Sequence, residues 1–374
     1  MASTHVINAS FLEEKPQPIS NKLMRTYKYL FTLAAALMTF TATANRLNDD
    51  RTPIHRPLIE EYTGTWCGWC VRGLVGMELL RDTFGDDFIG VAYHNGDAME
   101  IMTSNKYPNN VSGFPTAYIE RTSEVDPFYG FGYTTAGIIS AMQQYAALDV
   151  NAGIEVAAQW TSPERTAISV EVTSYFTIDD ESGKYALEVM LIADDLYGIG
   201  SDWNQSNYYS GYSSYANDPY LGEWVNKPST VRNIHFNDVL VGASGVISGS
   251  LPSTIVAYED YSYSYTFTLS NLPKPSLIKE RDKDNLHVIA VIVNKSNRKA
   301  INANRAYIDE YIVVVPGDVD NNGSISIDDV TALIDYLLSG DSTLISTANA
   351  DVDGDSQITI NDVTALIDML LSVQ

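Results

Sequence analysis

The sequence is poor in cysteine and in basic side chains. It has two cysteines in 374 residues, and 23 lysines and arginines against 47 aspartates and glutamates, a formal net charge of −24. Two cysteines exclude a scaffold held together by several disulfides. The acidic balance argues against nucleic acid as a partner, because phosphates need a basic surface. It argues equally against binding to an anionic membrane surface.

Long apolar runs are also scarce. Residues 29–40 form an apolar stretch that is too short to span a bilayer. Basic residues precede it and Ala-Thr-Ala at 42–44 follows, the order typical of a secretory signal. We therefore expect residues 1–44 to be an N-terminal extension and signal peptide, cleaved near Ala44, rather than a core helix. We expect no transmembrane segment in the mature chain, because no other segment is long and apolar enough.

The composition is otherwise that of a folded protein. Hydrophobic residues make up 45% of the chain and aromatic residues 11%, which is enough for real cores. The length predicts two or three domains. Residues 53–148 alternate apolar runs, such as 58–62 and 88–93, with helical spacing over 71–84. This alternation predicts an α/β layer fold.

Residues 150–315 have a different pattern. Runs such as 167–172 and 185–190 alternate with period two, and turn residues separate them, which predicts an antiparallel all-β sandwich. One stretch inside this segment, 197–224, is polar and rich in tyrosine and tryptophan. It is either a surface that binds sugar or peptide, or a loop that packs on its own aromatic rings. The second interpretation is favoured, because aromatic side chains mostly bury area.

The last 58 residues contain an internal repeat. The sequence of residues 329–339 recurs at 362–372, a period of 33, and only Tyr336 differs from its counterpart, Met369. Oxygen-bearing side chains stand at alternate positions in and before each copy, which is the spacing of a calcium-binding loop. Calcium takes about six to eight oxygen ligands. The pattern therefore predicts two calcium ions, one in each loop.

The two loops share one ligand pattern. In the first, the candidate ligands are Asp318, Asp320, Asn322, Ser324 through its backbone carbonyl, Ser326 and Asp329. In the second, they are Asp351, Asp353, Asp355, Gln357 through its backbone carbonyl, Thr359 and Asp362. Gly323 stands at the sharp turn of the first loop, whereas Ser356 stands there in the second. A side chain is unfavourable where φ is positive, so the second loop is expected to bind calcium more weakly.

Paired loop–helix repeats that end in Asp, at residues 317–374, resemble a type I dockerin. The resemblance implies calcium-dependent folding and binding to a cohesin domain on a scaffold or cell-surface protein. A merely structural calcium clip is the alternative. The segment holds eleven of the aspartates and no lysine, arginine or glutamate. We expect it to unfold without calcium, because its carboxylates then repel one another.

Both cysteines belong to one motif, Cys67-Gly68-Trp69-Cys70, between a predicted strand and a predicted helix. A helix N-terminus stabilises a thiolate. Cys67 is the upstream and more exposed candidate nucleophile, and Cys70 would resolve a mixed disulfide. Glu61, on the preceding strand, could accept a proton from Cys70. Pro115 immediately precedes a later strand, where its backbone could face a client protein.

Other uses of the cysteines are less consistent with the sequence. A zinc site would need His55 and His94 to meet the two sulfurs by coincidence. A haem attachment needs His directly after Cys70, where Val71 stands. An inert disulfide stays open as an alternative, although so short a loop gains little stability from it. His94 could tune Cys67, but a structural histidine at a strand end is favoured.

The order strand, Trp-Cys-x-x-Cys, helix, strand, proline, strand, helix resembles the thioredoxin fold. The resemblance implies functional roles for Cys67, Cys70, Glu61 and Pro115. The longer string of residues 61–70, together with 93–97, resembles the family identified as outer membrane protein 28-related, from Gram-negative anaerobes. That resemblance covers about residues 53–313.

The expected protein is therefore multidomain. It has a thioredoxin-like α/β domain (53–148), an all-β sandwich (150–315) and a small α-helical calcium-binding dockerin (317–374). The leading hypothesis is a secreted, cell-surface or periplasmic protein of a Gram-negative bacterium. It would exchange thiols and disulfides with client proteins through a redox-active Cys67–Cys70 disulfide. The alternatives are a non-catalytic surface or adhesion component, and an accessory protein of polysaccharide degradation, each assembled through the dockerin.

Overall fold

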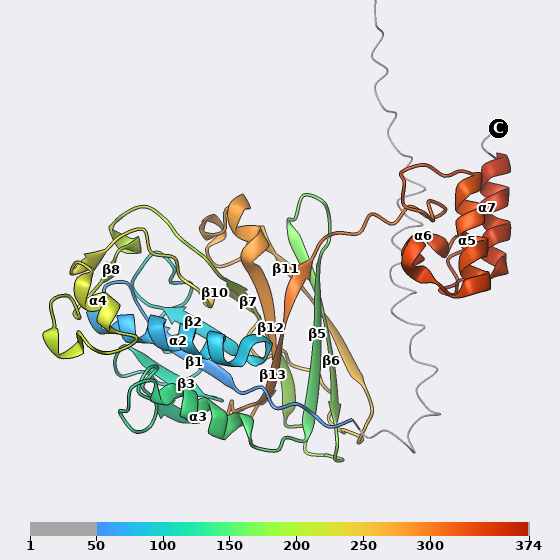
Figure 1. Cartoon of the computed structure of the whole chain (residues 1–374). Helices are drawn as coiled ribbons and strands as arrows, with labels where there is room; N and C mark the ends of the chain where they lie inside the picture. The colour runs from blue at the N-terminus through green and yellow to red at the C-terminus, as the bar shows by residue number, and fades with distance from the viewer. Residues whose placement is uncertain (1–50, 373–374) are drawn as a thin grey trace, which may run out of the picture. The chain divides into compact units, whose positions relative to one another are not determined.

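The computed structural model describes residues 51–372, so the predicted signal over 1–44 lies outside the described residues. The described residues fall into two compact units, 51–312 and 313–372 (Figure 1). Within residues 51–372, none of the helices combines the length and the apolar character that crossing a membrane requires.

The larger unit is built mainly from strands. Its strands are β1 (Leu58–Thr63), β2 (Ile89–His94), β3 (Thr116–Ile119), β4 (Ser123–Val125), β5 (Ala152–Trp160), β6 (Ala167–Phe176), β7 (Tyr185–Ala193), β8 (Gln205–Ser206), β9 (Thr230–Val231), β10 (Val239–Ala243), β11 (Tyr261–Thr268), β12 (Leu286–Asn294) and β13 (Ala300–Asp309). Its α-helices are α2 (Val71–Phe84), α3 (Gly137–Ala146) and α4 (Gly222–Asn226).

Eleven of these strands form one mixed sheet, in the order β11-β6-β5-β13-β12-β7-β10-β2-β1-β3-β4. The parallel pair β1–β2 joins the rest through β10, where Val239 pairs with Ala92. The Ala92 amide also donates to the Asp238 carbonyl at 2.7 Å. Strands from both sides of the boundary expected near residues 148–150 thus share one sheet, because β2 offers free backbone groups that β10 satisfies.

Separate clusters of buried apolar side chains lie against this sheet. Buried apolar side chains of β5 and β6, such as Ile154 and Val170, belong to one cluster with side chains of β7 and β12, such as Leu191 and Ile292. In another cluster, side chains of α2 and α3 pack against β1 and β3 (Figure 1). The period-two patterns of the sequence thus bury one face of β6, where Ile168, Val170 and Val172 are inaccessible to solvent.

The smaller unit is helical, with α5 (Ile327–Ser339), α6 (Thr347–Ala350) and α7 (Ile360–Ser372). Its core repeats with the sequence: Val330 and Leu333 of α5 pack with Val363 and Leu366 of α7. Ser326 caps α5, because its side chain accepts a hydrogen bond from the Asp328 amide. The sequence repeat is therefore also a repeat of structure.

Candidate functional site

Cys67 and Cys70 form a disulfide at the point where β1 has ended and α2 begins. The Cys67 residue is 6% exposed and Cys70 is fully buried. The order of exposure agrees with the prediction, but the sulfur-bearing residues are much less accessible than the motif alone suggests. Cys70 is the N-cap residue of α2, where a thiolate would face the free amides of the first helical turn.

Glu61 is buried on β1, and its Oε1 has no hydrogen-bond partner. A Cβ on Gly73 would lie 1.7 Å from this oxygen, so the carboxylate sits directly against α2. Positions 70 and 73 share a helix face, and the Glu61 carboxylate therefore faces the side of α2 that carries Cys70. Burial, opposed in part by a hydrogen bond with Thr63, raises the pKa of Glu61 to about 8.

Pro115 is buried directly before β3, and the Phe114–Pro115 peptide bond is cis. The Phe114 ring packs edge-on against the Trp66 ring, with 5.6 Å between centroids. Trp66 directly precedes Cys67, so the Phe114–Pro115 segment lies beside the disulfide motif.

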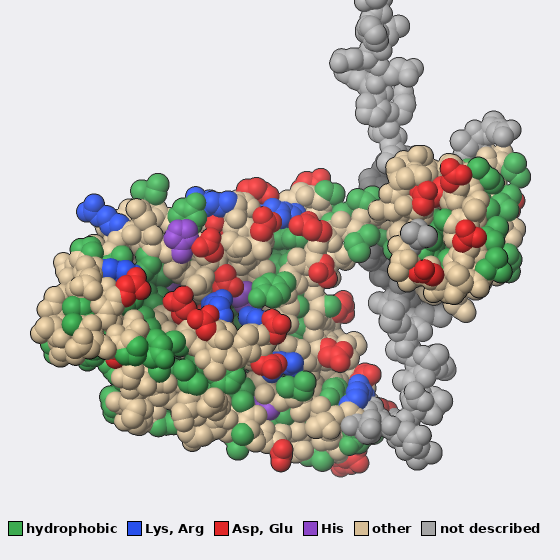
Figure 2. Space-filling model, viewed as in Figure 1, with side chains coloured by type: hydrophobic (Ala, Val, Ile, Leu, Met, Phe, Trp, Pro, Cys, Tyr) green, Lys and Arg blue, Asp and Glu red, His purple; other side chains and the backbone are tan. Residues whose placement is uncertain are grey.

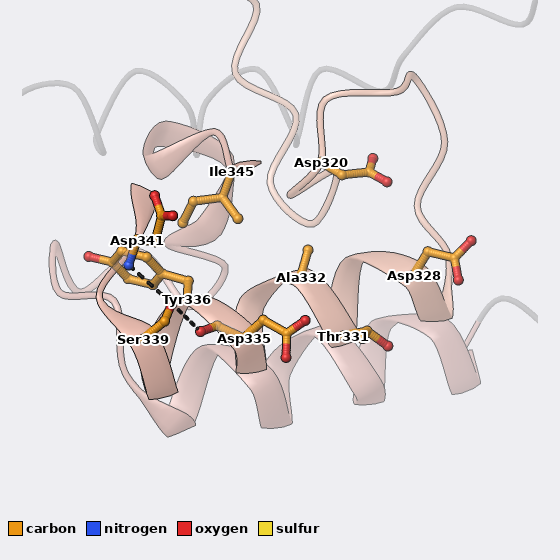
Figure 3. Close-up of a pocket in the computed structure, with 9 residues that line it drawn as sticks. All are labelled: Asp320, Asp328, Thr331, Ala332, Asp335, Tyr336, Ser339, Asp341 and Ile345. Atoms are coloured by element: carbon orange, nitrogen blue, oxygen red, sulfur yellow. Dashed lines mark hydrogen bonds between the residues drawn. The ribbon is translucent and has the colours of Figure 1, made fainter. Parts of the chain in front are cut away.

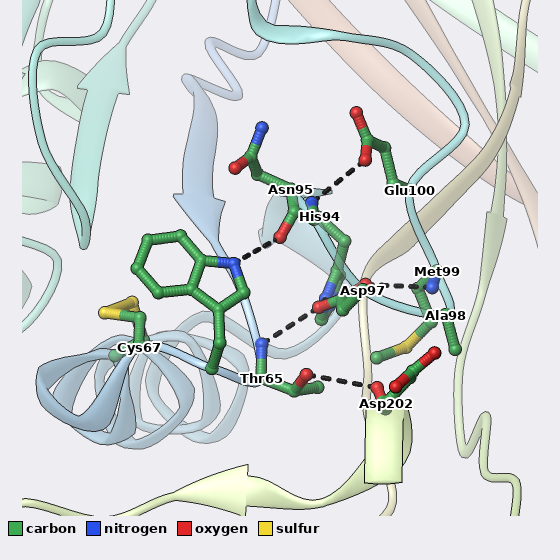
Figure 4. A network of polar contacts seen from close by, with 12 residues as sticks. Thr65, Cys67, His94, Asn95, Asp97, Ala98, Met99, Glu100 and Asp202 are labelled. Atoms are coloured by element: carbon green, nitrogen blue, oxygen red, sulfur yellow. Dashed lines mark hydrogen bonds and ion pairs between the residues drawn. A yellow bond between two sulfur atoms is a disulfide. The ribbon is translucent and has the colours of Figure 1, made fainter. Parts of the chain in front are cut away.

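A buried carboxylate holds the loop that leads into the motif (Figure 4). Asp97 Oδ2 accepts a hydrogen bond from the Thr65 amide at 2.9 Å and lies 2.7 Å from His94 Nδ1. Although burial alone would raise it, the pKa of Asp97 is lowered, because His94 and the amides of Thr65 and Met99 stabilise the charged form. His94 ends β2, as predicted, and reaches the motif through Asp97.

The aromatic stretch lies against the disulfide motif. Within residues 201–212, here called the covering segment, the Ser206 amide donates to the Thr65 carbonyl at 2.7 Å. The Gln205 side chain donates to the Cys67 carbonyl at 2.9 Å. The stretch also packs on itself, as predicted, since the Tyr209 and Tyr215 rings lie 4.9 Å apart. Sequence reasoning missed the contact of this stretch with the disulfide motif, because no local pattern connects residues so far apart in the chain.

In the first candidate calcium loop, carboxylate oxygens of Asp318, Asp320 and Asp329 lie within 4.8 Å of one another. The buried Asp329 also accepts hydrogen bonds from the amides of Asp320 and Ser326, at 3.0 and 2.7 Å. The turn residue Gly323 has φ 88°. A cluster of hard oxygen donors around a glycine turn fits calcium.

In the second loop, carboxylate oxygens of Asp351, Asp353 and Asp355 lie within 4.8 Å of one another. Asp362 is buried and accepts from the amides of Asp353 and Thr359, at 3.1 and 2.8 Å, as Asp329 does in the first loop. Ser356 has φ 67°, so this side chain does occupy the left-handed region that favours glycine. The remaining predicted ligands lie in the same two loops, namely Asn322, Ser324, Ser326, Gln357 and Thr359.

Residues 316–371 match the family model of the Dockerin type I domain. This part of the chain is a type I dockerin domain. Its match agrees with the repeat boundaries and with the paired acidic loops. The presence of a dockerin supports assembly through a cohesin-bearing partner.

The dockerin exposes apolar side chains in repeated pairs. Leu338 and its counterpart Leu371 are 82% and 65% exposed, and Ile327 and Ile360 are both 66% exposed. A hollow of about 410 Å³ runs along α5 (Figure 3). It is lined by Asp320, Asp328, Thr331, Ala332, Asp335, Tyr336, Ser339, Asp341 and Ile345. The visible dockerin surface carries acidic and apolar groups, whereas the larger unit mixes acidic with basic side chains (Figure 2).

No curated protein matches this chain. Similar solved structures include HBP35 of Porphyromonas gingivalis, with 17% identity, a TM-score of 0.42, and coverage of 71% of this chain and 81% of that one. A protein from Agrobacterium tumefaciens has 10% identity, a TM-score of 0.37, and coverage of 70% and 99%. A domain of the outer membrane lipoprotein Omp28 from P. gingivalis has 15% identity, a TM-score of 0.23, and coverage of 44% and 92%.

Proposed function

We propose that this chain is an exported thiol–disulfide exchange protein that its dockerin tethers to a cohesin-bearing partner. The observation that carries the proposal is the Cys67–Cys70 disulfide at the start of α2 with the buried Glu61 carboxyl beneath that helix. The proposed domain is thioredoxin-like, with the Phe114–Pro115 segment beside the motif. Its proposed location is outside the cell or at the cell surface, as the dockerin favours.

The exchange moves two electrons between the chain and a client. In the reducing direction, the Cys67 thiolate attacks a client disulfide and a mixed disulfide forms, while one client sulfur leaves as a thiolate. Cys70 then gives its proton to the Glu61 carboxylate and attacks Cys67 Sγ. The client leaves as a dithiol, and the chain keeps the Cys67–Cys70 disulfide. Glu61 suits this role because a pKa of about 8 lets it take and release a proton near neutral pH.

The dockerin supplies attachment. Two calcium ions, held by the acidic loops, would neutralise carboxylates that otherwise repel one another. The exposed apolar pairs on α5 and α7 provide a surface of the kind that marks protein interfaces. We expect calcium-dependent retention on immobilised cohesin domains, and loss of retention in the Leu338→Asp/Leu371→Asp variant. Retention that survives both chelator and these substitutions would contradict this use of the dockerin.

Client trapping tests the exchange proposal. With Cys70→Ser, the Cys67 mixed disulfide cannot be resolved, so clients should accumulate as adducts that a reductant releases. Cys67→Ser is the matched control and should trap none. The proposal fails if the two variants trap equal amounts from an extract of exported proteins.

One observation favours a second candidate, a non-catalytic surface or adhesion component: Cys67 is only 6% exposed. If the disulfide is merely structural, it should resist reductant under native conditions and its loss should leave binding functions unchanged. An accessory role in polysaccharide degradation would instead appear as glycan binding that survives loss of both cysteines.

A further inference from the structure

Four hydrogen bonds join the covering segment to the residues around the disulfide. Two are the Ser206 and Gln205 contacts described above. In addition, the Tyr208 amide donates to the Gly68 carbonyl at 3.1 Å. The Thr65 hydroxyl donates to the Asp202 carbonyl at 3.0 Å (Figure 4). These bonds connect parts of the chain that are about 138 positions apart, as for Gln205 and Cys67.

Both residues between the cysteines pack against the covering segment. A Cβ on Gly68 would lie 2.3 Å from the Tyr208 ring, so only glycine admits the ring at this position. Trp69 packs edge-on against the Tyr208 and Tyr209 rings, with centroids 5.6 and 5.4 Å away. The covering segment thus packs directly on Gly68 and Trp69, the two residues between the cysteines.

The covering segment is buried at Gln205 and exposed to solvent at Tyr208. Gln205 is 1% exposed, and its amide donates both to the Cys67 carbonyl and to the Ser206 carbonyl. Tyr208 is 59% exposed, so its ring lies against Gly68 while its outer face meets solvent. Cys67 itself is 6% exposed. Because exchange depends on access of the attacking thiolate to sulfur, the side chains beside Cys67 limit which thiols react.

Resting on the proposed function, we propose that the covering segment sets the client class, with Tyr208 as a specificity-determining residue and Gln205 as a positioning residue. Small thiols and extended cysteine-containing segments reach Cys67. Thiols on folded protein surfaces react more slowly, because the Tyr208 ring restricts their approach. When a dithiol reacts with the oxidised chain, the Cys67–Cys70 bond breaks and the dithiol itself becomes a disulfide. Two electrons thereby pass from the dithiol to the chain.

The test compares two dithiol probes of different size. The oxidised chain is reduced by dithiothreitol or by reduced thioredoxin, and alkylation followed by mass measurement reports the freed cysteines over time. Tyr208→Ala should accelerate reduction by thioredoxin about two- to tenfold, the factor expected from loss of one aromatic contact. The rate with dithiothreitol should stay within about twofold, since a small probe already has access.

Controls separate this effect from general loosening. Tyr220→Ala removes another exposed ring, whose centroid lies 6.2 Å from that of Phe128, and should leave both rates unchanged. Tyr208→Phe keeps the ring and should behave like the unchanged chain. If Tyr208→Ala does not fold, Gly68→Ala displaces the same ring and should give the same selective acceleration.

A ratio of the two rates that is equal in Tyr208→Ala, Tyr220→Ala and the unchanged chain would overturn the proposal. Gln205→Ala tests the positioning role, because it should raise the rate of reduction by thioredoxin. Gln205→Asn keeps an amide and should restore part of the selectivity between the two probes. These rates are chemical and need no natural client. Failure of client trapping with Cys70→Ser therefore remains distinguishable from failure of this proposal.

Discussion

The Glu61 carboxylate lies directly against Gly73, because a Cβ at position 73 would be 1.7 Å from Oε1. The close approach places a buried, unpartnered oxygen beneath the helix that starts at the disulfide. Two properties of this site can be tested separately, namely the missing Cβ of Gly73 and the proton of Glu61.

Gly73→Ala should lower the free energy of unfolding by about 1–3 kcal/mol, because the added methyl group overpacks a buried contact. Glu61→Ala removes the opposing carboxyl group, so the double variant should be more stable than the sum of the single effects predicts. Urea unfolding of the four proteins gives the coupling energy. Gly76→Ala is the control, because its Cβ would meet the Pro127 carbonyl and not Glu61. Strict additivity for Glu61 and Gly73 would contradict the packing described here.

Glu61 should also make stability depend on pH. Its pKa is raised from 4.5 to about 8 in the folded chain, mainly by burial, so the folded state holds a proton that the unfolded state releases. The contribution is therefore complete below about pH 4.5 and is lost as pH rises through about pH 8. The free energy of unfolding should fall over this window, and Glu61→Gln should flatten the fall. Asp238 adds a slope of the same sign, since burial raises its pKa to about 6, so the difference between the two proteins is the quantity to measure.

The sequence predicts those features of the site that repeat or follow one another closely. The paired aspartates Asp329 and Asp362 were recognisable from the repeat, and Cys67 and Cys70 from their motif. The pairing of Val239 with Ala92 was not predictable, because alternation reports which face of a strand is buried and not which strand lies next to it.

The contact between the covering segment and the disulfide motif was not predictable for a related reason. Its tyrosines indicate burial or binding, but nothing in their spacing selects Gly68 as the residue they contact. The need for glycine at position 68 becomes apparent only when the structure shows the Tyr208 ring packed against it. Long-range hydrogen bonds, such as that from Gln205 to the Cys67 carbonyl, likewise leave no periodic trace in the sequence.

A buried charge cluster gives a further prediction. The Arg121 side chain is 1% exposed and contacts Glu60 at 2.9 Å and Glu188 at 2.7 Å. Arg121→Leu would leave two buried carboxylates without their cation and should destabilise the fold by about 3–5 kcal/mol. Arg56→Leu, which removes a cation from a contact with the exposed Asp87, should cost about 0–1 kcal/mol. Equal losses in urea unfolding would show that the buried cluster is not the stronger contribution.

Removal of calcium should unfold the dockerin. A chelator leaves the aspartates of both loops unneutralised, so the helical signal of α5 and α7 should fall in circular dichroism while the strand signal remains. Asp329→Ala should lower the number of bound ions from two to one. Asp335→Ala removes the same charge from an exposed position on α5 and should leave both ions bound. A spectrum unchanged by chelator would count against calcium-dependent folding.

The second loop should bind calcium more weakly than the first, and Ser356 is the reason. Its φ of 67° lies in the left-handed region, which costs a residue with a Cβ roughly 1–2 kcal/mol. Ser356→Gly removes this cost and should tighten calcium binding at that loop by about five- to thirtyfold, at about 1.4 kcal/mol per tenfold. Calorimetric titration resolves the two sites. Gly323→Ser, at φ 88° in the first loop, is the reciprocal change and should weaken that site by a similar factor. If neither substitution moves its own site, backbone strain at the turn does not set the difference between the loops.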